Sequence, residues 1–216
     1  MKEFIKKYDH ILSILYLLIY LPWFAYVEEK NIGNINIIEA NIDDKIPFCE
    51  FFIIPYFLWF FYITITFIIF FFKDKKEYLN LCTFTFIGMT LFLIISTIYP
   101  NGHLLRPTFF KRDNIFVDMV KILYTIDTST NIFPSIHVFN SIAAHMAIKH
   151  TTFKKNDKKI KTISFILMFS IILSTMFLKQ HSFYDVIGGI TLSIILDYLI
   201  YGQKNKKEIN NLNFEM

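Results

Sequence analysis

The sequence predicts an all-α polytopic membrane protein whose spans form a six-helix transmembrane bundle. Three observations predict this fold: an excess of apolar residues, their arrival in six long runs, and basic residues gathered in every second connection. Hydrophobic residues make up 54% of the 216 residues, Phe alone contributes 26 of them, and the mean hydropathy is +0.44. This exceeds the balance of a soluble domain. Composition therefore places the chain among integral membrane proteins.

A helix needs about 20 residues to cross the hydrocarbon core of a bilayer, and six apolar runs of about that length can be placed. They leave little chain over, so we predict a single membrane domain over residues 1–216. The first run is predicted to be a retained span and not a cleaved signal, because the residues Leu21 to Tyr26 at its end are bulky and aromatic. The predicted spans cover residues 11–27, 51–72, 79–99, 135–150, 162–178 and 184–201.

The charges of the connections predict how the bundle is oriented. The N-terminal segment, the 73–78 turn and the tail hold three basic residues each and the 149–161 loop holds six, together 15 of the 22. With six spans all four segments lie on one side, and the positive-inside rule assigns that side, with both termini, to the cytoplasm. Contacts of these lysines to anionic membrane lipids account for the net charge of +4. No nucleic-acid partner is predicted.

The two outer connections differ in character. Residues 28–50 are acidic and alternate weakly in hydropathy, which fits a short amphipathic segment on the outer surface and an unstructured connector equally well. Residues 100–133 follow a turn signal at Pro100-Asn101-Gly102, carry Arg106 beside a proline, and end in a polar stretch. The second connection is therefore the better candidate for chemistry.

Two histidines stand on this outer side, each at the mouth of an apolar helix. His137 ends the run Phe133-Pro134-Ser135-Ile136-His137, and His181 begins the run His181-Ser182-Phe183-Tyr184-Asp185. Asp185 follows His181 at i+4 on the same helix face, so its carboxylate can orient the imidazole. A histidine that titrates near neutral pH can serve as nucleophile or acid, and the Arg106 guanidinium suits phosphate. The extracytoplasmic face is therefore predicted to carry an active site.

These fragments resemble, in order, the three signature motifs of the type 2 phosphatidic-acid phosphatase superfamily. An Arg-Pro follows the third span, a Pro-Ser-x-His opens the fourth, and a His-x-x-x-Asp followed by Val-Ile-Gly-Gly opens the sixth. The resemblance covers about residues 79–201. It implies a metal-independent phosphoric-ester hydrolase without a cofactor, acting on a phosphomonoester or pyrophosphate of a lipid.

The resemblance also implies a role for each site residue. His181 would attack phosphorus, Asp185 would hold its other ring nitrogen, and His137 would protonate the leaving oxygen and then activate water. Arg106 and the Ser135 hydroxyl would hold the non-bridging phosphoryl oxygens. Phosphoryl transfer asks mainly this positioning and charge stabilisation of a protein.

The sequence departs from the family pattern at three positions. The lysine expected seven residues before Arg106 is Tyr99, and the glycine of the second motif is Ile136. The arginine expected six residues before His181 is Thr175. Two cationic phosphate ligands of the pattern are therefore missing.

Lys179 is the predicted substitute for the missing arginine. It lies one helical turn after Thr175 and would enter the same neighbourhood if the fifth helix extends that far. This variant pattern is similar to the branch of the superfamily that includes inositol-phosphorylceramide and sphingomyelin synthases. A lipid headgroup phosphotransferase is therefore the alternative to a phosphatase.

Two other classes stay open. A channel or transporter would line a path with polar residues, but here these residues cluster at one membrane face and the spans show no internal repeat. A metallohydrolase is disfavoured because no pair of histidines has a helical metal-binding spacing. It would use His103, His137, His181 and Asp185.

The richness in Ile, Asn, Lys and Phe suggests an AT-rich bacterial source. We therefore expect the protein in a bacterial inner membrane, with a lipid phosphate as substrate. The sequence does not rank the possible lipid phosphates.

Overall fold

The computed structural model describes residues 9–30 and 35–202, and most of them lie in helices. The long apolar runs form helices because, within a bilayer, a helix satisfies its backbone hydrogen bonds internally. The main helical elements are η1 (Asp9–Tyr16), α2 (Leu17–Lys30), α3 (Ile53–Lys73), α4 (Lys75–Ile98), α5 (Ile115–Ile126), α6 (Ile136–Lys149), α7 (Asp157–Phe177) and α8 (Phe183–Ile200).

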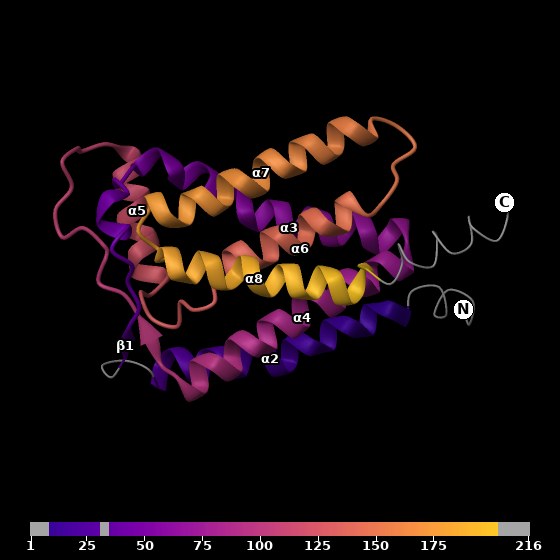
Figure 1. The fold of residues 1–216 in the computed structure, drawn as a ribbon, viewed down its shortest axis with the longest axis horizontal. Coiled ribbons are helices and arrows are strands. Elements are labelled where there is room, and N and C mark those ends of the chain that lie inside the picture. The colour runs from indigo at the N-terminus through magenta and orange to yellow at the C-terminus, as the bar shows by residue number, and fades with distance from the viewer. Residues whose placement is uncertain (1–8, 31–34, 203–216) are drawn as a thin grey trace, which may run out of the picture.

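The helices run back and forth between two ends of an elongated bundle (Figure 1). One end, here called the basic end, holds the α3–α4 and α6–α7 connections, which meet where Lys73 Nζ donates to the Thr152 carbonyl at 3.3 Å. The other end, the site end, holds the remaining described connections. There the short parallel strands β1 (Asn36–Ile37) and β2 (Asn101–Gly102) pair. The helices that run between these ends are η1 with α2, then α3, α4, α6, α7 and α8.

Five helical stretches within the described residues are long and apolar enough to cross a membrane. This finding confirms the predicted all-α membrane fold. The stretches are His10–Lys30, Glu50–Lys73, Lys75–Ile98, Asp157–Phe177 and Phe183–Ile200.

The remaining predicted span, residues 135–150, forms α6, which is shorter than predicted. Its 14 residues rise about 21 Å at 1.5 Å per residue, less than the hydrocarbon thickness of about 30 Å. It lies in the centre of the bundle, where it packs against α3, α4, α7 and α8, and ten of its residues are buried. A helix surrounded by protein need not match the bilayer, because irregular backbone at membrane depth is tolerated where protein covers it.

The outer connections hold more structure than the sequence predicts. In the first one, β1 pairs with β2, and η2 (Asp43–Lys45) and η3 (Glu50–Phe52) follow. The described part of this connection is therefore neither an unstructured connector nor one amphipathic segment. The second one contains α5, which starts where the Asn114 side chain accepts from two backbone amides and which buries Val117, Val120 and Leu123.

Candidate active site

His137, His181 and Asp185 lie in a line at the site end of the bundle. His181 Nε2 lies 3.4 Å from His137 Nδ1, and His181 Nδ1 lies 3.5 Å from Asp185 Oδ2. His181 and Asp185 are buried. The structure therefore brings together the three residues that the sequence singles out, with the carboxylate on one edge of the His181 ring and His137 on the other.

The first turn of α8 fixes Asp185 beside His181. Ser182 is the N-cap, and its hydroxyl accepts from Tyr184 N at 3.3 Å. Asp185 Oδ2 accepts from Ser182 N at 2.8 Å and so completes a capping box. A carboxylate in the first turn is also stabilised by the helix dipole. The capping interaction and the contact to His181 use the same carboxylate oxygen.

Two glycines let α8 approach the start of α6. A Cβ on Gly189 would lie 2.9 Å from the Ser135 carbonyl oxygen, and one on Gly188 would lie 2.6 Å from the Phe133 ring. A backbone hydrogen bond links the two segments, because Ser135 N donates to the Asp185 carbonyl at 3.1 Å. Ser135 is also the N-cap of α6, where its hydroxyl accepts from Val138 N at 3.3 Å. This approach brings the two histidines within reach of each other.

His137 packs against two aromatic rings of α3. Its ring centroid lies 4.8 Å from that of Tyr56 and 4.5 Å from that of Trp59. Tyr56 in turn donates its hydroxyl to Asp127 Oδ2 at 2.6 Å. The sequence did not lead us to predict these supporting residues, although Tyr56 and Trp59 are three residues apart and so share a helix face.

Arg106 fastens the end of α5 to the residue that precedes His181. Its guanidinium lies 4.4 Å from the Tyr124 ring centroid, and burial lowers its pKa, although an arginine stays charged in proteins. It donates to the carbonyl oxygens of Tyr124 at 3.2 Å, Asp127 at 2.7 Å and Thr128 at 2.8 Å, and to Gln180 Oε1. Arg106 thus lies beside the site, and its contact to a phosphoryl group stays a prediction.

His103 is held as a neutral imidazole. Its Nδ1 accepts from Leu105 N at 3.1 Å, which leaves the proton on Nε2 to be donated to the Gln180 carbonyl at 2.9 Å. Burial lowers the pKa of His103 to about 4, against an opposing contribution from the Gln180 carbonyl. This ring therefore braces the backbone next to His181.

Lys179 points away from the position that the sequence predicts for it. Helix α7 ends at Phe177, and Lys179 adopts a positive φ of 53°. Its ammonium donates to the Asp43 carbonyl at 2.5 Å, and burial lowers its pKa. Thr175 is fully buried and its hydroxyl donates to the Ile172 carbonyl. The condition for Lys179 to replace the missing arginine, a longer fifth helix, is thus not met, and its role as phosphate ligand stays a prediction.

A cavity of about 970 Å³ opens onto the two histidines. Its walls come from α2, α3, α5 and the segment between α5 and α6, and most of them are apolar. The polar groups gather with His137, His181 and Gln180, beside carboxylates of Glu28 and Asp127. A cavity with one polar end and a long apolar remainder fits an amphiphile.

The charge of this cavity is negative. Three carboxylates line it, those of Glu28, Glu29 and Asp127, and no lysine or arginine is among the described residues that do so. Glu28 is already engaged, because its two oxygens accept from Thr128 Oγ1 at 2.7 Å and Asn131 Nδ2 at 2.5 Å. The predicted cationic phosphate ligands therefore lie behind the cavity wall and not on it.

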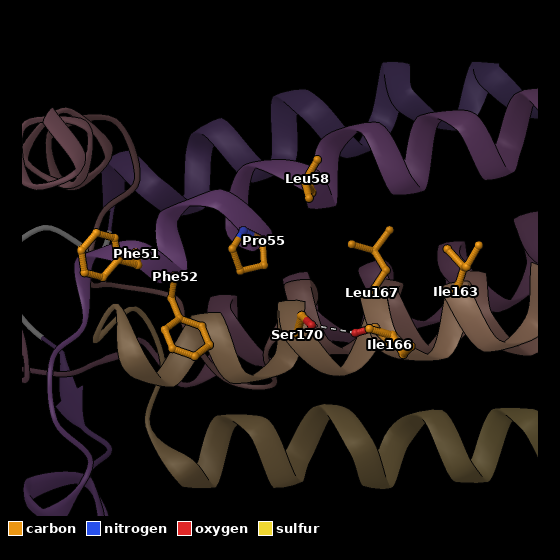
Figure 2. Close-up of a pocket in the computed structure, with 8 residues that line it drawn as sticks. All are labelled: Phe51, Phe52, Pro55, Leu58, Ile163, Ile166, Leu167 and Ser170. Atoms are coloured by element: carbon orange, nitrogen blue, oxygen red, sulfur yellow. Dashed lines mark hydrogen bonds between the residues drawn. The ribbon is translucent and has the colours of Figure 1, made fainter.

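A second pocket, of about 490 Å³, lies between the start of α3 and the outer side of α7 (Figure 2). Phe52, Pro55 and Leu58 face Ile163 and Leu167 across it. Its one polar side chain, Ser170, donates to the Ile166 carbonyl of its own helix at 2.8 Å. This pocket offers no titratable group, so the candidate chemistry belongs to the first cavity.

The structure gives a metallohydrolase no ligand set within residues 9–30 and 35–202, where no three His, Cys, Asp or Glu side chains are grouped for metal binding. Of the four candidate ligands, His103 has turned to the Gln180 carbonyl. The other three form the line described above.

Comparison with known proteins supplies a family. No curated protein and no solved structure matches the chain. A family model, that of the PAP2 superfamily, matches residues 104–209. This finding confirms the resemblance to the type 2 phosphatidic-acid phosphatases, whereas the likeness to the synthase branch stays a hypothesis. Over residues 104–209, which contain Arg106, Ser135, His137, Lys179, His181 and Asp185, the chain matches the PAP2 superfamily.

Proposed function

We propose that this protein is a membrane lipid phosphate phosphatase that works through a phosphohistidine on His181. The observation that carries the proposal is the line His137, His181, Asp185 at the polar end of an amphiphilic cavity. The match to the PAP2 superfamily supports phosphatase or phosphotransferase activity in general. The substrate and the mechanism are our inference.

In the first step His181 Nε2 attacks phosphorus. The new N–P bond forms as the bond from phosphorus to the lipid oxygen breaks, and His137, which enters this step as an imidazolium, gives its Nδ1 proton to that oxygen. Asp185, at the far nitrogen of His181, stabilises the positive charge that the ring acquires. A nucleophile in near-attack geometry lies about 3–3.5 Å from phosphorus, so the two histidine rings, 3.4 Å apart at their nitrogens, must separate to admit the group.

In the second step water takes up the phosphoryl group. His137, now neutral, removes a proton from water as its oxygen attacks phosphorus, and the N–P bond breaks to release inorganic phosphate. Charge on the phosphoryl oxygens is to be stabilised by the Ser135 hydroxyl, the start of α6 and the nearby Arg106 guanidinium. The oxygens can approach the start of α6 because His137 lies in its first turn.

The location of the site supports a lipid substrate and an outer-face reaction. The cavity lies at the site end, opposite the lysine-rich basic end that the positive-inside rule assigns to the cytoplasm. Its apolar walls of α2, α3 and α5 suit acyl or isoprenyl chains. We infer an enzyme of a bacterial inner membrane with an extracytoplasmic site and cytoplasmic termini.

The test is the activity of purified protein in lipid nanodiscs on a panel of lipid phosphomonoesters and pyrophosphates. Wild type should release phosphate and form an acid-labile phosphoenzyme, and His181→Ala should do neither. His137→Ala should turn over slowly but still become labelled by an activated phosphoryl donor. The control is His150→Gln, which changes a histidine at the basic end that pairs with Asp197 at 2.9 Å. Phosphate release by His181→Ala at the wild-type rate would refute the proposal.

The carboxylates of the cavity favour a second candidate function, transfer of a lipid headgroup to another lipid. Glu28, Glu29 and Asp127 would repel a dianionic monoester but attract a headgroup that carries a positive charge next to a phosphodiester. Aromatic rings in the same wall, including Trp59 and Phe57, add favourable sites for such a cation. The acceptor of the phosphohistidine would then be a lipid hydroxyl.

The two candidates differ in their products. Nanodiscs that contain phosphatidylcholine and a fluorescent diacylglycerol or ceramide should give a fluorescent phospholipid if headgroups are transferred, whereas a phosphatase gives only inorganic phosphate from monoesters. Glu29→Gln, which neutralises the exposed carboxylate of the wall, should lower use of the choline lipid and raise that of monoesters. No fluorescent product with either acceptor would exclude this transfer.

A further inference from the structure

We infer that Asp43, in the first outer connection, is a positioning residue for His181. The inference rests on the proposed function, in which His181 is the nucleophile. Asp43 lies outside the residues that match the PAP2 superfamily. It is separated from His181 by most of the chain, yet its side chain is only 2% exposed.

The Asp43 carboxylate binds the segment that follows His181. Oδ2 accepts from Ser182 Oγ at 2.6 Å, and Oδ1 accepts from Phe183 N at 2.8 Å. Oδ2 also accepts from the backbone amide of Ala40 at 2.7 Å, which fixes the carboxylate within its own loop. One buried side chain thus joins the first connection to the residue after His181 and to the first amide of α8.

The Asp43 backbone binds the segment that precedes His181. Its carbonyl oxygen accepts from Lys179 Nζ at 2.5 Å. Lys179 is two residues before His181, and Phe183 is two residues after it, so Asp43 contacts both flanks of the nucleophile. Helix α7 also holds this segment through its backbone, since the amides of Gln180 and His181 donate to the Thr175 carbonyl.

The electrostatics of the helix start explain why an aspartate suits this position. Phe183 N belongs to the first turn of α8, where backbone amides lack intrahelical partners and the helix dipole favours negative charge. Of these amides, that of Ser182 donates to the Asp185 carboxylate. The next one, that of Phe183, donates to the Asp43 carboxylate. A neutral side chain of the same size would lose the charge and would turn an NH2 group toward at least one of the three donors.

The contacts of Asp43 with Lys179, Ser182 and Phe183 are here called the Asp43 clamp. His181 depends on this clamp because it lies in the short non-helical link between α7 and α8. A ring displaced by about 1 Å from its reacting position costs about 100-fold in rate. We therefore expect loss of the clamp to lower the phosphorylation rate of His181 while substrate binding in the apolar cavity persists.

The experiment compares Asp43→Asn with Asp44→Asn in nanodiscs. Both changes remove one negative charge at neighbouring positions, but Asp44 is exposed. Hydrogen exchange of the peptide over residues 179–184 should rise in Asp43→Asn and not in Asp44→Asn. Single-turnover phosphorylation should fall about 10- to 100-fold in Asp43→Asn with KM little changed, and Asp44→Asn should react like wild type.

Ser182→Ala serves where Asp43→Asn fails to fold, since it removes one donor to Asp43, together with the cap acceptor of Tyr184 N, and leaves Phe183 N bound. It should give a smaller fall in the same rate constant, again with KM unchanged. Wild-type exchange and rates in Asp43→Asn, or wild-type rates in Ser182→Ala when Asp43→Asn does not fold, would overturn the inference. If wild-type protein forms no phosphohistidine but Asp43→Asn loosens residues 179–184, the proposed function fails and the clamp stands.

Discussion

Replacement of Gly189 by alanine tests whether the approach of α8 to α6 sets the distance between the two histidines. The added Cβ would lie 2.9 Å from the Ser135 carbonyl oxygen and 3.2 Å from two Val138 side-chain atoms. Ordinary contact begins at 3.4 Å, and a backbone oxygen at a helix start cannot turn aside. The start of α8 must therefore move by roughly 0.5 Å relative to α6, a shift at the tolerance of a catalytic arrangement.

The expected effect falls on rate more than on stability. A misplacement of 1 Å costs about 100-fold, so a shift of half that size should lower the single-turnover rate about 10-fold. In a helix, alanine gains up to about 1 kcal/mol over glycine, and this gain offsets part of the roughly 1–3 kcal/mol of overpacking. The Tm should therefore fall only slightly.

The neighbouring glycine supplies the control. A Cβ on Gly188 would lie 2.6 Å from the edge of the Phe133 ring, which is the far end of a side chain and can rotate away. Gly188→Ala carries the same helix-propensity gain and should keep nearly wild-type rates. Phosphorylation is measured in nanodiscs with a labelled lipid phosphate that wild type uses. A wild-type rate in Gly189→Ala, or equal losses in both variants, would refute the reasoning.

Three further predictions concern metal, orientation and pH. Excess EDTA should leave turnover intact and vanadate should inhibit it, whereas loss in EDTA that zinc restores would favour a metallohydrolase. In a cysteine-free background, Phe109→Cys, at a site 78% exposed at the site end, should react with an impermeant thiol reagent in intact cells, and Lys154→Cys should not. Acidification from about pH 6.5 to 4 should destabilise wild type by about 3 kcal/mol more than His103→Gln, because burial lowers the folded pKa of His103 to about 4 and the unfolded chain then binds the proton more readily. Tm measured against pH in detergent checks this, and parallel curves would contradict it.

The apolar helices and the pairing of His181 with Asp185 could be predicted from the sequence because each rests on local information. Apolar runs determine where a helix can lie in a bilayer, and the i+4 spacing of His181 and Asp185 places both on one face. Helix α5 carried a comparable signal, since Asn114 precedes Val117, Val120 and Leu123 at helical spacing. That signal was present in the sequence and was missed.

Other features depend on contacts between distant segments and leave no trace in a single sequence. The prediction for Lys179 assumed that α7 continues past Phe177, but the chain turns there and carries the ammonium to Asp43. Asp43 itself is one of several acidic residues in its loop, and only packing distinguishes it as buried.

Two parts of the chain contribute differently to the candidate site. The residues that match the PAP2 superfamily contain His137, His181 and Asp185, and contacts from earlier in the chain also hold these three residues in place. Tyr56 and Trp59 of α3 pack against His137, and Asp43 contacts both flanks of His181. Helix α2 and α3 also form much of the apolar wall of the cavity. Under the proposed function, changes in the first hundred residues should therefore alter which lipid reacts and how fast, while His181 remains the nucleophile.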